Sequence, residues 1–111
     1  ISERCKPELR NHTIETAGIL NKAGVPMCIC TDHPVVPEQY LPLSAGLAVR
    51  GGLDRDEALK AITIYPAQIT GIADRVGSIE VGKDADIVIF SGDPLSVCDT
   101  PDMVIVNGTV I

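Results

Sequence analysis

The sequence predicts a chain of the α/β class in which helices flank one buried strand and a β meander closes the chain. The strand is predicted at Val25–Cys30, an uninterrupted apolar run between a glycine and the polar cluster Thr31–Pro34. Such a run is typical of a strand covered on both faces in a parallel sheet. Apolar residues at helical spacing precede and follow it. From Val76 onward, short β-rich runs punctuated by glycine replace that spacing and indicate further strands.

The first two helices are predicted from their start and stop signals. Thr13 is expected to cap a helix over Ile14–Ala23, and Gly24 is expected to end it just beyond the C-cap. A loop containing two prolines follows the strand. A second helix is then predicted within Glu38–Gly51, with Pro42 in its first turn, where proline is tolerated. This second helix would pack back on the sheet.

Two further helix starts follow closely in the sequence. Asp54 and Glu57 form a variant of the capping box, in which Asp54 accepts the backbone N–H of Glu57 and the Glu57 side chain reaches back. The helix that they start is predicted at Arg55–Thr63. A proline at the first helical position is expected to open another helix over Pro66–Thr70, which Gly71 ends.

The last third of the chain is predicted to contain only strands and turns. Val76–Lys83 is expected to form a short strand or a pair of turns. The dipeptide Asn107–Gly108 between two apolar runs predicts a hairpin with a type I′ turn. The other strands are predicted at Ala85–Phe90, Met103–Val106 and Thr109–Ile111. The change of period divides the chain into residues 1–75 and residues 76–111.

Composition and charge narrow the classes of partner. The chain has 111 residues, a formal net charge of −6 and no cluster of Lys or Arg, which argues against nucleic acid and against an anionic membrane surface as partners. No apolar run approaches the roughly 18 residues of a transmembrane helix, and no leader of the signal-peptide type is present. The sequence begins at Ile1 rather than at Met, and we expect it to be cut from a longer chain.

The cysteines do not form the framework of a disulfide-rich fold. Cys28 and Cys30 would share one face of the predicted strand, which is a poor geometry for a bridge, and Cys5 and Cys98 are distant in the sequence. We therefore expect reduced thiols and a cytoplasmic protein.

Asp32 is the first candidate for a functional residue. Side chains alternate along a strand, so its carboxylate should emerge on the side of Cys30. Ligands and catalytic groups gather at the carboxyl ends of parallel strands. The alternative is that Asp32 only forms a turn or caps a helix, as aspartates before X-Pro often do. His33, beside it, fits a hydrogen-bonded loop residue more readily than a metal ligand.

Several stretches together resemble the C-terminal part of the amidohydrolase superfamily, the metal-dependent hydrolases that include imidazolonepropionase, dihydroorotase and cytosine deaminase. The most specific is Gly77–Ile89, GSIEVGKDADIVI, which follows the superfamily pattern Gly-Ser-Ile-x-x-Gly-Lys-x-Ala-Asp. It lies downstream of Thr31–Pro34, TDHP, and the resemblance covers nearly all of the chain. Pro7–Asn11 together with TDHP is nearest to the imidazolonepropionase-related branch. Other matching stretches are Ala23–Pro26, Asp54–Thr63, Tyr65–Ala67, Gly92–Pro94 and Val104–Ile111.

The resemblance implies a specific fold. Residues 1–75 would be the C-terminal part of a TIM-like (β/α)8 barrel, comprising helix 7, strand 8 and the helices that follow. Residues 76–111 would supply the C-terminal strands of a small β-sandwich. Val25–Thr31 would then be barrel strand 8, and Asp32 the aspartate at its end. In this superfamily that aspartate binds the metal and carries a proton from the nucleophilic water to the leaving group. Asp86 would be structural.

The resemblance also implies an activity. The parent protein would use a divalent metal, with zinc expected, to hydrolyse a non-peptide C–N bond in a small cyclic amide, amidine or N-acyl substrate, and His33 would contact that substrate. The superfamily's His-x-His motif and its further metal ligands are absent, and His12 and His33 are the only histidines. Because a catalytic zinc site needs about three protein ligands, we expect the isolated chain to be inactive and not to hold metal tightly. The alternative is a non-catalytic, amidohydrolase-like scaffold or interaction protein.

The missing part of such a barrel predicts association. A strand at Val25–Thr31 and the C-terminal strands would have unpaired edges and uncovered faces, which favour pairing with another chain. We therefore expect a homodimer or higher oligomer, with strands exchanged or paired between copies.

Overall fold

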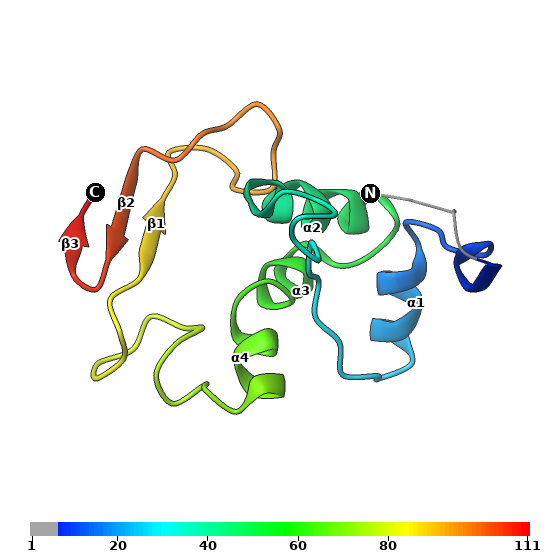
Figure 1. Cartoon of the computed structure of the whole chain (residues 1–111), viewed down its shortest axis with the longest axis horizontal. Helices are drawn as coiled ribbons and strands as arrows, with labels where there is room; N and C mark the ends of the chain where they lie inside the picture. Colours follow the sequence, from blue (N-terminus) through cyan, green and yellow to red (C-terminus); the bar gives the residue numbers. More distant parts are fainter. Residues whose placement is uncertain (1–6) are drawn as a thin grey trace.

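The computed structural model describes residues 7–111, so Cys5 and the first residues of the predicted N-terminal loop lie outside the described part. Helices gather on one side of the molecule and a small sheet lies at the other, joined by long loops (Figure 1). The α/β class is therefore confirmed. In residues 7–111 the elements are 3₁₀ turns at Pro7–Leu9 and Glu38–Tyr40, helices α1 (Thr16–Lys22), α2 (Leu41–Arg50), α3 (Arg55–Lys60) and α4 (Ile64–Thr70), and strands β1 (Ile87–Ile89), β2 (Met103–Val106) and β3 (Thr109–Val110).

Helix α1 starts later than predicted, and Thr13 is not its cap. The Thr13 hydroxyl accepts the N–H of Glu15 (3.3 Å), and the Thr13 carbonyl accepts the N–H of Thr16 (3.2 Å). Thr13 therefore forms a turn that precedes the helix. The N-cap position belongs to Glu15, whose side chain makes no capping hydrogen bond.

The end of α1 is as predicted. Gly24 has a φ of 71°, in the left-handed region that glycine adopts without a Cβ penalty. Its N–H donates to the Asn21 carbonyl (2.9 Å), and the next N–H, of Val25, donates to the Leu20 carbonyl (3.0 Å). These two bonds form a Schellman motif, which fixes the direction in which the chain leaves α1.

The predicted strand at Val25–Cys30 is not formed. The segment has no regular secondary structure, because a parallel strand needs hydrogen-bonded neighbours and residues 7–111 place no strand beside it. The predicted alternation is nevertheless present: Met27 and Ile29 are half-buried against the helical core, whereas Cys28 and Cys30 are exposed free thiols. The segment is thus covered on one side, not on both.

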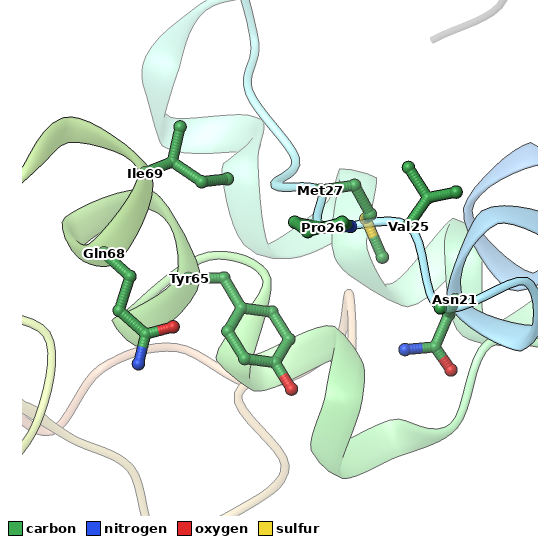
Figure 2. Close-up of a pocket in the computed structure, with 8 residues that line it drawn as sticks. Asn21, Val25, Pro26, Met27, Tyr65, Gln68 and Ile69 are labelled. Carbon is green, nitrogen blue, oxygen red and sulfur yellow. The ribbon is translucent and has the colours of Figure 1, made fainter.

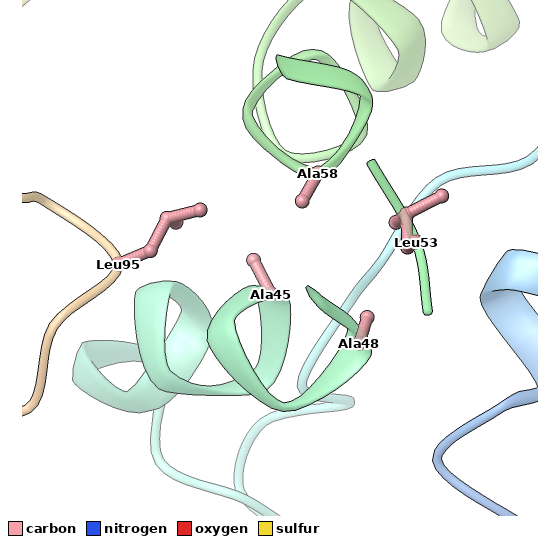
Figure 3. Packing of buried hydrophobic residues seen from close by; sticks show 5 residues of the cluster. All are labelled: Ala45, Ala48, Leu53, Ala58 and Leu95. Atoms are coloured by element: carbon pink, nitrogen blue, oxygen red, sulfur yellow. The ribbon is translucent and has the colours of Figure 1, made fainter. Parts of the chain in front are cut away.

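The core lies between α2 and α3 and is built from short side chains. Ala45 and Ala48 of α2 face Ala58 of α3, with Leu53 and Leu95 closing the two ends (Figure 3). Alanines allow the two helix axes to approach closely, and Leu95 brings a loop of the C-terminal part against α2. The facing sides of α2 and α3 are therefore buried against each other and against Leu95.

Helices α3 and α4 correct two details of the prediction. Asp54 caps α3 by accepting the N–H groups of Asp56 (2.9 Å) and Glu57 (3.2 Å), but the Glu57 side chain does not reach back to it. Helix α3 ends at Lys60, so α4 begins earlier than predicted, and Pro66 is its third residue rather than its first. Proline is tolerated there because the first turn needs no intrahelical N–H. Gly71, with a φ of 75°, ends α4 as predicted.

The sheet is antiparallel, in the order β1-β2-β3. Asn107 and Gly108 both have positive φ, 49° and 78°, which confirms the predicted type I′ turn between β2 and β3. Asp86 accepts the N–H of Asn107 (2.7 Å), so its carboxylate has the structural role expected for it. Val88 is 50% exposed and Val110 is 60% exposed, so the described residues leave apolar side chains of the sheet uncovered.

Two ion pairs in residues 7–111 join the two parts of the chain, Arg75 with Asp84 (2.6 Å) and Arg55 with Asp93. Arg55 at the start of α3 contacts both carboxylate oxygens of Asp93 (2.7 and 3.4 Å), and Asp93 also accepts the N–H of Leu95 (2.9 Å). These contacts hold the loop that carries Leu95 against the helices. Among residues 7–111, none of the helices has the length and apolar composition needed to cross a membrane.

Candidate functional site

Asp32 lies in a tight turn at the end of the extended segment. Its φ is 53°, a left-handed conformation that aspartate tolerates better than most residues. The turn is closed by the N–H of Val35, which donates to the Asp32 carbonyl (2.8 Å), and by the N–H of Val36, which donates to the Thr31 carbonyl (3.2 Å). The backbone of Asp32 therefore makes the turn, and its carboxylate projects from it.

The carboxylate itself is not used for local structure. Within residues 7–111, no hydrogen bond or ion pair engages the Asp32 side chain, and the N-cap position of α2 belongs to Tyr40. Side-chain capping or an Asx turn, the structural alternatives for Asp32, are therefore not what this carboxylate does. An exposed acceptor held on a constrained turn remains available to a ligand.

A hollow of about 500 Å³ opens beside this turn, between α1, the extended segment and α2. Asp32 lines it together with Cys30 and Thr31, and His12 lines it from the loop before α1. The N–H of His12 donates to the Leu9 carbonyl (2.9 Å), which fixes the loop. The structure thus brings His12 and Asp32 to one hollow, although they are 20 positions apart in the sequence. His33 is exposed and does not line it.

The residues present do not make a complete metal site. Among residues 7–111, no group of three or more His, Cys, Asp or Glu side chains is arranged to hold a metal ion. A carboxylate at this position can donate one oxygen ligand, whereas a catalytic zinc needs about three protein ligands. The described part of the chain therefore does not by itself supply the ligand set of a catalytic zinc.

A second hollow, of about 480 Å³, lies at the other end of the extended segment, between the end of α1 and α4. Figure 2 shows Tyr65 of α4 with its hydroxyl directed toward the side where Asn21 of α1 lies. Both side chains donate to the same carboxylate oxygen of Glu57: the Tyr65 hydroxyl at 2.7 Å and the Asn21 amide at 3.0 Å. Lys60 donates to the other oxygen at 2.8 Å.

The electrostatics of this cluster follow from its hydrogen bonds. The bond from Lys60 and then that from Tyr65 hold the pKa of Glu57 below its ordinary value. The same carboxylate raises the pKa of Lys60 and of Tyr65. Glu57 is therefore an ionised, fully bonded carboxylate that joins three helices. Sequence analysis missed this because Asn21 and Glu57 are 36 residues apart, and the only signal was a Glu at a capping position.

Comparison with known proteins assigns the family. Residues 3–111 match the amidohydrolase family. The chain is 35% identical over 104 residues to amidohydrolase tasK of Hapsidospora irregularis, covering 94% of this chain and 11% of that protein. It is 46% identical over 72 residues to an imidazolonepropionase of Geobacillus kaustophilus, covering 62% and 17% respectively. The crystal structure of an amidohydrolase from Thermotoga maritima MSB8 superposes with a TM-score of 0.93 at 40% identity, covering 99% of this chain and 29% of that one.

The chain therefore belongs to the amidohydrolase family. The resemblance expected from the sequence is confirmed, with imidazolonepropionases among the relatives. The chain spans less than a third of the length of each relative named above.

Proposed function

We propose that this chain is the C-terminal segment of a metal-dependent amidohydrolase that hydrolyses a non-peptide C–N bond in a small cyclic amide, amidine or N-acyl compound. The observation that carries the proposal is the family match over residues 3–111 combined with the position of Asp32, which lines the hollow beside the end of the extended segment and whose carboxylate has no bonding partner within residues 7–111. In the whole protein Val25–Thr31 would be barrel strand 8, completed by neighbours from outside residues 7–111. Residues 1–75 would belong to the barrel, and residues 76–111 to a small β-sandwich.

Asp32 has two roles in this proposal. Its carboxylate supplies one oxygen ligand to a divalent metal, with zinc expected, and the remaining ligands come from outside the described residues. When bound, the metal supplies the acidity that makes water a nucleophile near neutral pH. Asp32 takes a proton from the attacking water and delivers it to the leaving nitrogen. The constrained turn holds the carboxylate in one place while it does so.

The substrate contacts are proposed more broadly. His33 follows Asp32 in the same turn but does not line the hollow. A contact between His33 and the substrate therefore requires that the rest of the barrel extend the binding site to this side of the turn. The imidazolonepropionases among the relatives support a small, cyclic, nitrogen-containing substrate. The reduced cysteines and the absence of a basic patch support a cytoplasmic enzyme without nucleic acid or membrane partners.

The alternative function is a non-catalytic scaffold of the same fold. Residues 7–111 contain no group of three or more metal-type side chains, which both proposals expect, because the remaining ligands would come from outside these residues. The hydrolase requires further metal ligands from the rest of the protein, and the scaffold does not. Metal-dependent turnover therefore separates the two proposals.

The test is metal removal and return. The full-length protein should hydrolyse at least one member of a panel of hydantoins, imidazolones, cyclic amidines and N-acyl amino acids. Dialysis against a chelator should abolish this turnover, and added zinc should restore it. A zinc-loaded, folded protein with no turnover on any class of the panel would contradict the proposed function and support the scaffold.

We further propose that the isolated 111-residue chain associates, at least as a homodimer. A second copy would cover the exposed apolar side chains of β1–β3 and the extended segment Val25–Thr31, which pairs with no strand of residues 7–111. The interface should bury more than about 1,000 Å². Light scattering at micromolar chain concentration should give a mass of two or more copies, and a monomer would contradict this proposal.

A further inference from the structure

The extended segment that leads to Asp32 is attached to the helices at two points. At its start, the N–H of Val25 donates to the Leu20 carbonyl at the end of α1 (3.0 Å). Four residues further, the N–H of Ile29 donates to the carbonyl of Ala61, the C-cap residue of α3 (2.9 Å). Asp32 follows only three residues after the second attachment. The placement of the α1 and α3 ends therefore contributes to the position of Asp32, beside any strand neighbours from outside residues 7–111.

The Glu57 carboxylate joins these two attachment points. Asn21, which donates to Glu57, is the neighbour of Leu20 at the first attachment. Lys60, which also donates to Glu57, is the neighbour of Ala61 at the second. Tyr65 adds the start of α4 to the same carboxylate. One side chain thus links the helix ends that hold both attachment points.

The carboxylate is suited to this role by its surroundings. The Glu57 side chain is 24% exposed, so its hydrogen bonds are partly shielded from water. Bonds to an ionised acceptor are stronger than bonds between neutral groups. The Glu57 carboxylate does not make the predicted capping bond to the backbone N–H of Asp54. Its donors are instead three side chains, Asn21 on α1, Lys60 on α3 and Tyr65 on α4.

We propose that Glu57 is a positioning residue for Asp32: it fixes the spacing of the α1 and α3 ends and, through the backbone bonds of Val25 and Ile29, sets where the Asp32 carboxylate lies. This inference rests on the proposed function for its effect on turnover. Its effect on the segment does not depend on that function.

The test compares Glu57→Ala with Arg55→Ala in the full-length protein. Both variants remove an ion pair of α3, but Arg55 contacts Asp93 in the C-terminal loop and touches neither attachment point. The first readout is hydrogen–deuterium exchange of fragments spanning residues 25–31, measured relative to the buried Leu53 amide, which donates to the Ala48 carbonyl. Glu57→Ala should raise this relative exchange about tenfold or more, and Arg55→Ala should leave it unchanged.

The second readout is turnover. Displacement of a catalytic group by a fraction of an ångström to an ångström costs up to about 100-fold in rate. Glu57→Ala should therefore lower kcat by about 10- to 100-fold with little change in KM, while Arg55→Ala stays near the parent. Glu57→Gln keeps an acceptor for Asn21 and Tyr65 and should restore most of kcat. If Glu57→Ala does not fold, Tyr65→Phe and Asn21→Ala each remove one donor and should give smaller changes in the same direction.

The inference would be overturned if Glu57→Ala and Arg55→Ala gave the same relative exchange of residues 25–31 and the same kcat. Its failure is distinguishable from failure of the proposed function. If Asp32→Asn leaves kcat unchanged, the proposed function fails, and the exchange of residues 25–31 alone then decides whether Glu57 holds the segment.

Discussion

The α2–α3 core and the C-terminal sheet contain similar aliphatic side chains but differ in what covers them. Ala45 and Ala58 are 0% exposed, because short side chains let the two helices close on each other. In the sheet, Val88, Met103 and Val110 remain largely open. The contact between α2 and α3 is thus fully buried, with Leu95 of the C-terminal part closing one end, whereas the described residues leave one face of the sheet uncovered. Regions of the first kind should tolerate isolation from the rest of the protein better than regions of the second.

The largest loss of stability is expected when a buried side chain of the α2–α3 core is shortened. Leu53 is 3% exposed, so Leu53→Ala should lower the free energy of unfolding by about 2–5 kcal/mol. Val110→Ala, at an exposed position of β3, should change it by less than about 0.5 kcal/mol. Urea unfolding of the 111-residue chain at submicromolar concentration, where association is weakest, measures both. A larger loss for Val110→Ala would contradict the comparison.

A smaller effect is expected where a loop touches α2. A Cβ at Gly46 would meet the Leu95 carbonyl oxygen at 2.5 Å, so Gly46→Ala must push that loop away from the helix. The cost of such overpacking is about 1–3 kcal/mol. Thermal unfolding should show the loss. The neighbouring Ser44→Ala should show less, because it adds no atom toward the Leu95 loop and removes only the exposed hydrogen bond from the Ser44 hydroxyl to the Tyr40 carbonyl (3.0 Å). Equal losses would mean that the Leu95 loop does not rest on α2.

The smallest effect is a pH dependence. The bonds from Lys60 and Tyr65 lower the pKa of Glu57 in the folded chain, so folding favours its ionised form. This contribution is complete above the pKa of an unfolded glutamate and is lost as the pH falls through the lower, folded value. Stability measured from neutral pH downward should decline through the acidic range, and Glu57→Gln should flatten part of that decline. An unchanged profile for Glu57→Gln would show that the carboxylate is not bonded as described.

Signals that require a positive φ at one residue were predictive, whereas the predicted cap at Thr13, the reach-back of Glu57 and the helix start at Pro66 were wrong. Gly24, Gly71 and the Asn107–Gly108 turn were predicted correctly, because each depends only on its own φ and on neighbours within a few residues. The strand at Val25–Cys30 was predicted wrongly, because strand formation needs a partner that residues 7–111 do not provide.

The candidate site shows the same division. Asp32 was predicted as a site residue from its place after an apolar run, and this stays a prediction; within residues 7–111 the structure adds that no hydrogen bond or ion pair engages its side chain. Its shared hollow with His12 and the bond between Asn21 and Glu57 depend on tertiary packing. No spacing rule within one helix or strand could have revealed either of them.

The most direct test of the account is the turnover of Asp32→Asn in the full-length protein. The amide keeps the size of the carboxylate but cannot take a proton from water, so kcat should fall by about 10²–10⁴-fold, or more if a metal contact is also lost, while the protein stays folded. Asp56→Asn, at a side chain that is 79% exposed on α3, is the matched control and should retain parental turnover. Near-parental turnover of Asp32→Asn would remove Asp32 from the chemistry and contradict the account.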